Sequence, residues 1–483
     1  MKNITKIIIV SLVIAAAFGC NNDKYGGWDD GYSEPSFGGD KFTDYGENQF
    51  VAASEMPTST FSVDTDGASY TIMRRYFNND QKPPVASVRI EEYLNYFTFD
   101  YPEPHSGHNV SLQTEIASCP WTDGNYLLRI GLKGKDIPES QLPPTNYVFL
   151  IDVSGSMDSP DKLGILKEGF NSLVDVLGAQ DRIAIVTYAG SSRVVLKSTS
   201  CDEKSKIKKA IGKLSAGGST AGAQGILTAY EIAKENFIPG GNNRIIIGSD
   251  GDFNVGPSSN EALVGLIEGQ RDYGIYLTVL GVGSGNLNDS MMEQLANKGN
   301  GTYEYIDNVD QMQKVFVNER SKFHAVAKDC KIQVNFNSAV VEKYRLIGYE
   351  NRVMNNDDFD DDKKDAGEIG VGQTVTAIYE IVPTETFSGK AADIDIRYKL
   401  PSGAKNVMTL GGSAQAADTN IMSASENMRF AAGVTAFGLR MKNSEFKGKA
   451  DKAMVLELCA EATGSDPFGY RQEFVRLAKK IGF

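Results

Sequence analysis

The sequence predicts an α/β fold: a doubly wound, mostly parallel sheet inserted into a smaller β-sandwich-like domain, with N-terminal helices and a C-terminal helical segment. Two observations predict it. Between residues 145 and 325, apolar strand-like runs alternate with helical runs, which is typical of a parallel sheet covered by helices on both faces. Outside this block, strand-like runs follow one another without helices between them, as in a sandwich. A length of 483 residues with 41% hydrophobic residues suffices for several ordinary cores.

The first residues, 1–19, are interpreted as a lipoprotein signal peptide. Lys2 and Lys6 precede an apolar stretch that is too short to span a bilayer but has the length of a signal-peptide core. The end of this stretch, Ala17-Phe-Gly-Cys20, resembles a lipobox, which predicts acylation of Cys20 and a firm lipid anchor. We therefore expect a location in the cell envelope, at the outer membrane. The alternative is an ordinary secretory peptide.

Residues 20–50 alternate Gly, Asp and single aromatic residues without a helical or strand period, and this composition predicts a flexible tether. The next segment, 51–144, shows apolar stripes at helical spacing followed by strand-like alternation. It predicts two helices near 70–77 and 88–97 and two strands at 110–117 and 126–132.

The block 145–325 is predicted to be one α/β domain. Its strands are expected at 146–151, 182–188, 193–197, 244–249, 275–281 and 302–305. Its helices are expected near 160–177, 203–213, 222–236, 260–271, 289–298 and 309–323. The strand 193–197 follows its neighbour across a short turn, so it is expected to be an antiparallel edge strand.

After this block the pattern changes to strands at 330–336, 374–382 and 392–400, within a β-rich domain spanning 326–423. We expect the strands before residue 145 to pair with these, so that the α/β domain is an insertion. The remaining segment, 424–483, is predicted to be helical, with helices at 424–441, 448–462 and 467–481.

Asp152, Ser154 and Ser156 stand directly after the buried strand 146–151. Alternate residues of an extended turn point the same way, so one carboxylate and two hydroxyls converge on one spot. Asp250 ends the strand 244–249, and Thr220 lies in a glycine-rich loop. Strand ends meet at one edge of such a sheet, where ligands bind at a topological switch point. Oxygen ligands of this kind suit a hard cation.

This constellation resembles the metal-ion-dependent adhesion site of the von Willebrand factor type A domain. The resemblance implies Mg²⁺ as the cation, with Mn²⁺ or Ca²⁺ as alternatives. The shortage of histidine and the lack of cysteine in the motif argue against zinc. The implied ligands are Asp152, Ser154, Ser156, Thr220 and Asp250, with Gly218 and Asp252 at the rim.

Three longer phrases, at 218–222, 251–256 and 345–352, extend the resemblance to the bacterial YfbK-like group of lipoproteins with a type A domain. The resemblance implies a non-enzymatic binding module, in which an acidic residue of a partner protein completes the coordination of the cation. Two alternatives stay open: a scaffold subunit of an envelope assembly or transport complex, and a hydrolase with an unrecognised site. The chain has neither a nucleophile elbow nor a P-loop, which argues against the hydrolase.

Other features of the sequence carry weaker hypotheses. The net charge of −13 argues against nucleic-acid or anionic-lipid partners. His105 and His108 form a possible metal pair, and the acidic run 357–362 a possible loose calcium site, but solvated loops explain both. Cys119 and Cys330 flank the α/β block, and the two ends of such a domain can lie close together. An exported chain can oxidise its thiols, so we expect a disulfide between these two cysteines. Buried free thiols are the alternative.

Overall fold

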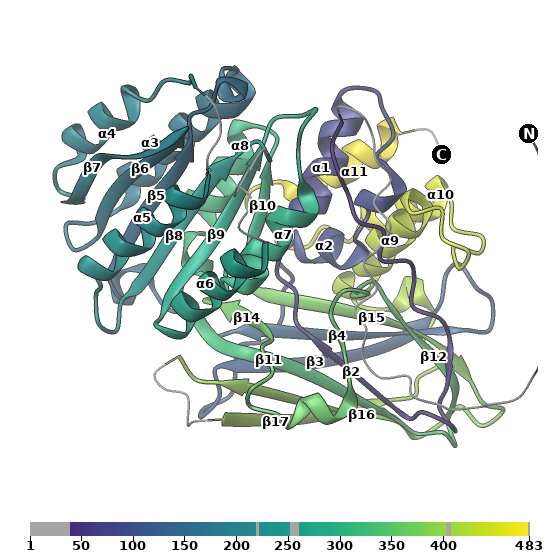
Figure 1. The fold of residues 1–483 in the computed structure, drawn as a ribbon. Coiled ribbons are helices and arrows are strands. Elements are labelled where there is room, and N and C mark those ends of the chain that lie inside the picture. Colours follow the sequence, from purple (N-terminus) through teal and green to yellow (C-terminus); the bar gives the residue numbers. More distant parts are fainter. Residues whose placement is uncertain (1–38, 219–221, 252–259, 402–406, 482–483) are drawn as a thin grey trace, which may run out of the picture.

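The computed structural model describes residues 39–218, 222–251, 260–401 and 407–481. An α/β unit lies beside a β-sandwich, and helices from both ends of the chain gather next to them (Figure 1). Cys20 and the signal peptide lie outside the described residues. Among the described helices, none is both long enough and apolar enough to cross a membrane.

The α/β unit is built on a sheet in which every neighbouring pair is parallel except the edge pair β6–β7. This arrangement confirms the predicted doubly wound sheet with an antiparallel edge strand. In spatial order the strands are β10 (Tyr303–Ile306), β9 (Ile275–Val282), β8 (Asn242–Ser249), β5 (Thr145–Asp152), β6 (Arg182–Ala189) and β7 (Ser191–Ser200).

Helices cover both faces of this sheet, and β5 shows why. Its alternate residues enter two different cores, Tyr147 and Phe149 on one face and Val148 and Leu150 on the other. The first core is closed by α3 (Ile165–Val176), α4 (Lys204–Gly212) and α8 (Val309–Gln313). The second is closed by α5 (Gly222–Glu235), α6 (Asn260–Asp272) and α7 (Asp289–Lys298).

The sandwich combines strands from before and after the α/β unit, which confirms that the unit is an insertion. One sheet runs β1 (Val51–Ala52), β12 (Val341–Ile347), β15 (Thr374–Pro383), β4 (Tyr126–Gly134) and β3 (Val110–Ser118). The other runs β13 (Val353–Met354), β2 (Thr58–Ser62), β11 (Ala325–Phe336), β16 (Lys390–Lys399) and β17 (Val407–Gln415), with β14 (Gly367–Gly370) paired to β11. A single apolar core fills the space between the two sheets.

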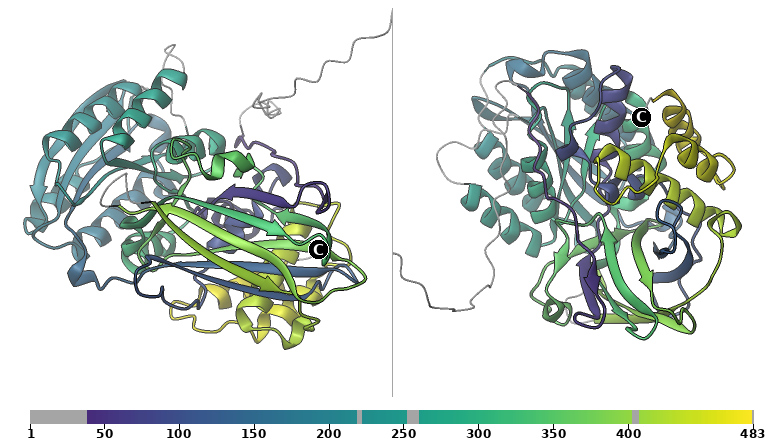
Figure 2. Two further views of the ribbon diagram at one scale, coloured as in Figure 1. Left: turned by 90° about the horizontal axis from the view of Figure 1, so that it is seen from below. Right: turned by 90° about the vertical axis from the view of Figure 1, so that its right-hand side faces the viewer.

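A helical layer packs on the outer face of the first sheet, as the two views of Figure 2 show. It holds α2 (Ile90–Asn95), α9 (Glu426–Met441), α10 (Lys452–Ala460) and α11 (Tyr470–Lys480). Helix α1 (Ala68–Asn78) joins the helical layer to the α/β unit. Its Tyr70 and Met73 enter the core of the helical layer, whereas Ala68 and Ile72 enter the core of the α/β unit.

The helix predicted at 309–323 is broken. After α8, residues Lys314–Asn318 form a π-helical turn and Arg320–Phe323 a 3₁₀ turn. Three successive residues of the wide turn, Lys314, Val315 and Phe316, are buried. The turn also brings the Lys314 ammonium to 2.5 Å from a Glu319 carboxylate oxygen.

The expected disulfide between Cys119 and Cys330 is wrong. Both thiols are free and buried, as are those of Cys201 and Cys459. Cys119 packs in the core of the helical layer, whereas Cys330 packs in the core of the sandwich, so a sheet separates them. Burial raises the pKa of both thiols, as expected for cysteines that act as small hydrophobic residues.

His324 lies at the junction between the last turn of the α/β unit and β11, where it is 6% exposed. Neither ring nitrogen has a hydrogen-bond partner among the residues that the structure describes. Burial, together with the positive charges of Arg244 and Arg320, lowers the pKa of the imidazole to about 4. His324 is therefore held in its neutral form inside the fold.

Acidification is expected to destabilise the protein through this histidine. The folded pKa lies below the unfolded value of about 6.5, so the stabilising contribution is present above pH 6.5 and is lost as the pH falls towards 4. We expect a loss of about 2 kcal/mol between pH 7 and pH 4.5. Buried carboxylates with raised pKa values, such as Glu368, act in the opposite direction, so the measurement compares urea unfolding of wild type and His324→Phe at both pH values. An equal loss of stability in wild type and in His324→Phe would contradict the assignment of this loss to His324.

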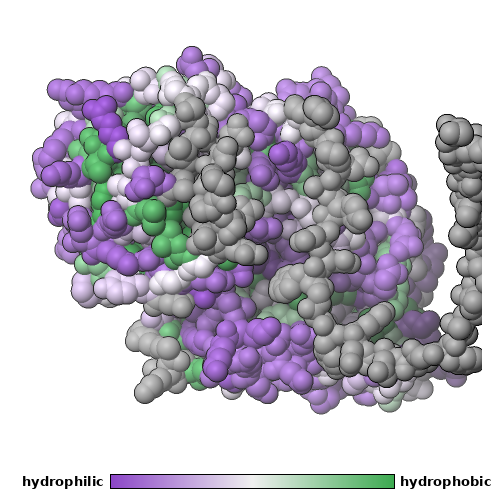
Figure 3. All heavy atoms as spheres, viewed as in Figure 1, coloured by the Kyte–Doolittle hydropathy of each residue, from purple (hydrophilic) through white to green (hydrophobic). Residues whose placement is uncertain are grey.

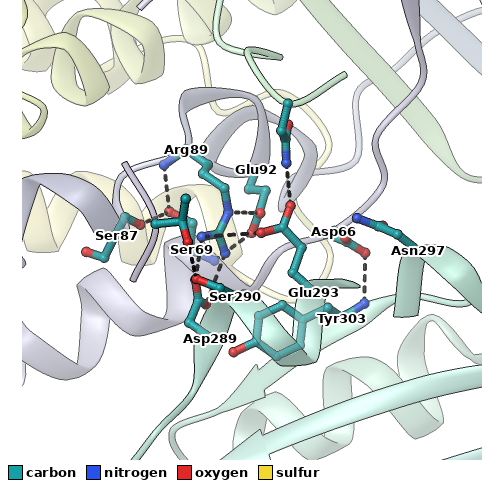
Figure 4. Close-up of polar contacts among 12 residues, drawn as sticks. Asp66, Ser69, Ser87, Arg89, Glu92, Asp289, Ser290, Glu293, Asn297 and Tyr303 are labelled. Carbon is teal, nitrogen blue, oxygen red and sulfur yellow. Dashed lines mark hydrogen bonds and ion pairs between the residues drawn. The ribbon is translucent and has the colours of Figure 1, made fainter. Parts of the chain in front are cut away.

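A buried cluster of charges fastens α2 and the segment that precedes α1 to α7 of the α/β unit and to the β12–β13 loop of the sandwich (Figure 4). Arg89 donates to Asp289 over 2.6 and 3.2 Å and is also ion-paired with Glu92. Arg352 donates to Asp64 over 2.8 Å and lies 3.4 Å from Asp66. Glu293 completes the cluster, 3.9 Å from Arg89. We call these residues the junction cluster: Asp64, Asp66, Arg89, Glu92, Asp289, Glu293 and Arg352.

Candidate metal centre

Asp152 and Asp250 stand together at the carboxyl edge of the α/β sheet. Asp152 is the last residue of β5, and Asp250 directly follows β8, its parallel neighbour. On its other side β5 pairs with β6, so the chain leaves β5 at a point where the strand order changes direction. This is the switch point at which open α/β sheets bind ligands. Both aspartates are 0% exposed.

The turn after β5 draws the first ligand group together. The Ser154 amide donates to Asp152 Oδ1 over 2.8 Å, and the hydroxyl oxygens of Ser154 and Ser156 are 3.0 Å apart. Residues Gly155–Met157 form a 3₁₀ turn that leaves Ser156 exposed while Ser154 is buried. The three side chains therefore converge, and the group opens to solvent on the Ser156 side.

Burial, hydrogen bonds and charges shift the pKa values of Asp152 and Asp250 in opposite directions. Burial raises the pKa of Asp152 to about 6, and the negative charge of Asp250 adds to the increase. The Ser249 hydroxyl donates to Asp152 Oδ2 over 3.3 Å. Burial also raises the pKa of Asp250, but hydrogen bonds from Asn286, Lys162 and Ser156 outweigh it, so the net pKa is lowered.

The glycine-rich loop before α5 docks on the same turn. The Gly217 amide donates to Val153 O over 2.7 Å, and the Gly155 amide donates to Gly218 O over 3.0 Å. Gly218 has φ +95°, a conformation that side chains rarely adopt. The structure thus places Gly218 beside the turn. Thr220 and Asp252 lie outside the described residues.

Lys162 and Asn286 are functional candidates that the sequence reasoning missed. The Lys162 ammonium donates to Asp250 Oδ2 over 2.9 Å and to Asn286 Oδ1 over 3.2 Å. One signal was available for Lys162, because it shares a helical stripe with the buried Leu166 and Phe170. Nothing local marks Asn286, which arrives on the loop after β9.

The donor chemistry of this edge fits a hard divalent cation. Every side chain gathered around the turn offers oxygen, and two carboxylates are placed against the single ammonium of Lys162, which leaves an excess of negative charge. Among the residues that the structure describes, no cluster of three or more His, Cys, Asp or Glu side chains is positioned to hold a metal, at this edge or elsewhere. Asp360 and Asp362 of the acidic run pair with Arg397, and His108 lies 3.5 Å from the Tyr398 hydroxyl.

Comparison with known proteins agrees with this architecture. The family described as von Willebrand factor type A domain matches residues 146–318. The family described as uncharacterized protein YfbK, C-terminal, matches residues 321–395 and 385–482, and one described as von Willebrand factor matches residues 36–129.

Among curated proteins, the uncharacterized protein YfbK of Escherichia coli K12 is 37% identical over 476 residues, which cover 90% of this chain and 80% of YfbK. An uncharacterized Synechocystis protein is 27% identical over 192 residues, 39% of this chain and 44% of the relative.

Solved structures include a von Willebrand factor type A protein from Catenulispora acidiphila, which is 15% identical, covers 78% of this chain and 91% of that chain, and has a TM-score of 0.44. BatB of Bacteroides thetaiotaomicron is 24% identical, covers 37% of this chain and 98% of that chain, and has a TM-score of 0.32. From the extent and identity of the match to YfbK, the chain belongs to the YfbK family and carries a von Willebrand factor type A domain.

Proposed function

We propose that this protein binds a partner protein through a divalent cation held at the carboxyl edge of its type A domain. Type A domains are commonly involved in protein–protein interaction. The observation that carries the proposal is the convergence of Asp152, Ser154 and Ser156 next to Asp250 at the switch point. Mg²⁺ is the proposed cation, with Mn²⁺ or Ca²⁺ as alternatives, and Thr220 is the proposed fifth ligand.

The ligand set explains why an acidic partner residue would be attracted. Hydroxyl oxygens are neutral, so only Asp152 and Asp250 offset the charge of the cation, and the ion pair with Lys162 offsets part of the charge of Asp250. When bound, the cation would supply a Lewis-acidic position that accepts a carboxylate oxygen. The protein contributes orientation: the Ser154 amide and the Ser249 hydroxyl hold Asp152, and Lys162 and Asn286 hold Asp250.

Apolar surface next to this edge supports a protein partner. Strand β7 and helix α5 both begin at the carboxyl edge, and the Ser192 and Thr228 hydroxyls join them over 3.1 Å. Val194 on β7 and Leu227 on α5 are 40% and 39% exposed. Figure 3 shows hydrophobic residues exposed on this body, whereas the sandwich below it is largely hydrophilic. A partner carboxylate on the cation could thus be flanked by apolar contacts.

We also propose that acylation of Cys20 anchors the protein in the cell envelope, at the outer membrane. The support is the lipobox-like sequence at the end of the signal-peptide core. The tether that follows would keep the type A domain accessible to partners. The pairing of a binding domain with an anchor favours a non-enzymatic role.

Affinity capture from envelope extracts tests the proposed function. Wild type should capture a defined protein in Mg²⁺ and lose it in EDTA, and Ser154→Ala should fail to capture it in either buffer. Ser205→Ala is the matched control. Ser205 is an exposed serine at the start of α4, and the chain just before α4 contacts Asp181, which directly precedes β6. Ser205 therefore lies at the amino edge of the sheet, opposite the proposed metal site. Capture that survives both EDTA and Ser154→Ala would contradict a metal-bridged interface.

A further inference from the structure

Lys162 places a positive charge inside the proposed metal site. Its side chain is 11% exposed, and Asp250, to which its ammonium donates over 2.9 Å, is 0% exposed. We propose that Lys162 is a specificity-determining residue: by pairing with Asp250, it makes the metal-loaded site one charge unit more positive and so selects an anionic ligand. This inference rests on the proposed function and defines the ligand class of the same site.

The backbone around Lys162 is shaped to hold it there. Lys162 belongs to a π-helical turn, Pro160–Gly164, that precedes α3. Its aliphatic stem lies over Gly283, and a Cβ at that glycine, which has φ +71°, would overlap the lysine side chain. Wide helical turns of this kind are frequent at functional sites. Lys162 is thus positioned by local structure as well as by its ion pair.

The second acceptor of Lys162, Asn286, is itself fixed by its loop. The amides of Gly285 and Leu287, on either side of Asn286, donate to Asp40 Oδ1 over 2.7 and 3.2 Å. Asp40 also pairs with Arg75 of α1. Lys162 is therefore held between Asp250 and Asn286, and the loop that carries Asn286 is fastened by Asp40.

The charges around the site give Lys162 its effect. In the described residues, Asp152 and Asp250 face the site with two carboxylates, and Lys162 faces it with one ammonium group. Counted over these three side chains, a divalent cation leaves a net charge of about +1 with the lysine and about 0 without it. Lys162 should accordingly weaken cation binding and strengthen the binding of a carboxylate to the loaded site.

Two measurements on the same variant are expected to move in opposite directions. Lys162→Gln keeps a donor near Asp250 but removes the charge, and Lys162→Met removes both. We expect Lys162→Gln to bind Mn²⁺ about tenfold more tightly than wild type in calorimetry. Acetate, titrated at constant ionic strength, should displace water from the Mn²⁺ bound to wild type, which is measured by proton relaxation. The same displacement in Lys162→Gln should require an acetate concentration about tenfold higher.

Lys206→Gln is the matched control, because Lys206 is an exposed lysine on α4 that pairs only with the neighbouring Glu203 in the described structure. It changes the net charge equally and should leave both measurements unchanged. Equal or weaker Mn²⁺ binding by Lys162→Gln, with wild-type binding intact, would overturn the role of Lys162 alone. Absence of Mn²⁺ binding in wild type and in both Lys162 variants would overturn the proposed function itself, and the inference with it.

Discussion

Replacing Arg89 by methionine is expected to lower the free energy of unfolding by about 3–5 kcal/mol. Arg89 is 3% exposed and faces Glu92, Asp289 and Glu293, which are 0%, 0% and 2% exposed. Removing one member of a buried ion-paired group leaves the remaining charges desolvated and unpaired.

Urea unfolding of Arg89→Met, compared with that of the control variant Arg397→Met, measures this effect. Arg397 also faces two carboxylates, Asp360 and Asp362, but these are 86% and 56% exposed. Solvent screens such pairs, so Arg397→Met should cost no more than about 1 kcal/mol. Similar losses of unfolding free energy in Arg89→Met and Arg397→Met would show that the junction cluster does not hold the α/β unit and the sandwich together.

The second large effect is expected from Asp152→Ala/Ser154→Ala, which removes a carboxylate and a hydroxyl from the proposed ligand set. A ligand that binds only the folded state stabilises it, by about 2.7 kcal/mol at a concentration one hundred times Kd. Wild type should therefore unfold at higher urea concentration in Mg²⁺ than in EDTA, and the variant should unfold at the same concentration in both.

Each protein is compared with itself in the two buffers, so any change in the intrinsic stability of the variant cancels. Ser205→Ala should retain the full Mg²⁺-induced shift, because Ser205 lies outside the ligand set. A shift of equal size in the double variant would place the stabilising ion elsewhere in the protein.

The fold of the α/β unit could be predicted from sequence because its signal is local. Apolar runs such as 146–151 and 244–249 are buried strands whichever neighbour they pair with, and the alternation with helices fixes their parallel arrangement. The convergence of Asp152, Ser154 and Ser156 followed from the same local periodicity, because a turn directly after a strand fixes where its side chains point.

Features that depend on distant parts of the chain could not be predicted. Arg89 meets Asp289, which lies 200 positions away in sequence, and no composition or spacing near either residue indicates the partner. Asn286 reaches Lys162 across a separation of 124 positions. The disulfide failed for the same reason, since the proximity of domain ends does not fix which side of a sheet each thiol occupies.

Strands with weak apolar character were also missed. Strand β12 (Val341–Ile347) carries the exposed pair Glu342 and Lys343 near its start, and β17 (Val407–Gln415) contains two adjacent glycines and has only one buried residue. Such strands are defined by the backbone of their neighbour, β15 or β16, and not by their own side chains.

The metal site is tested most directly by isothermal titration with Mg²⁺ and Mn²⁺ of the wild-type protein and of the variant Asp152→Ala/Ser154→Ala. The predicted result is saturable binding of a single ion by wild type and no binding by the variant. Equal binding by both proteins, or no binding by wild type, would contradict a cation site formed by Asp152, Ser154, Ser156, Thr220 and Asp250.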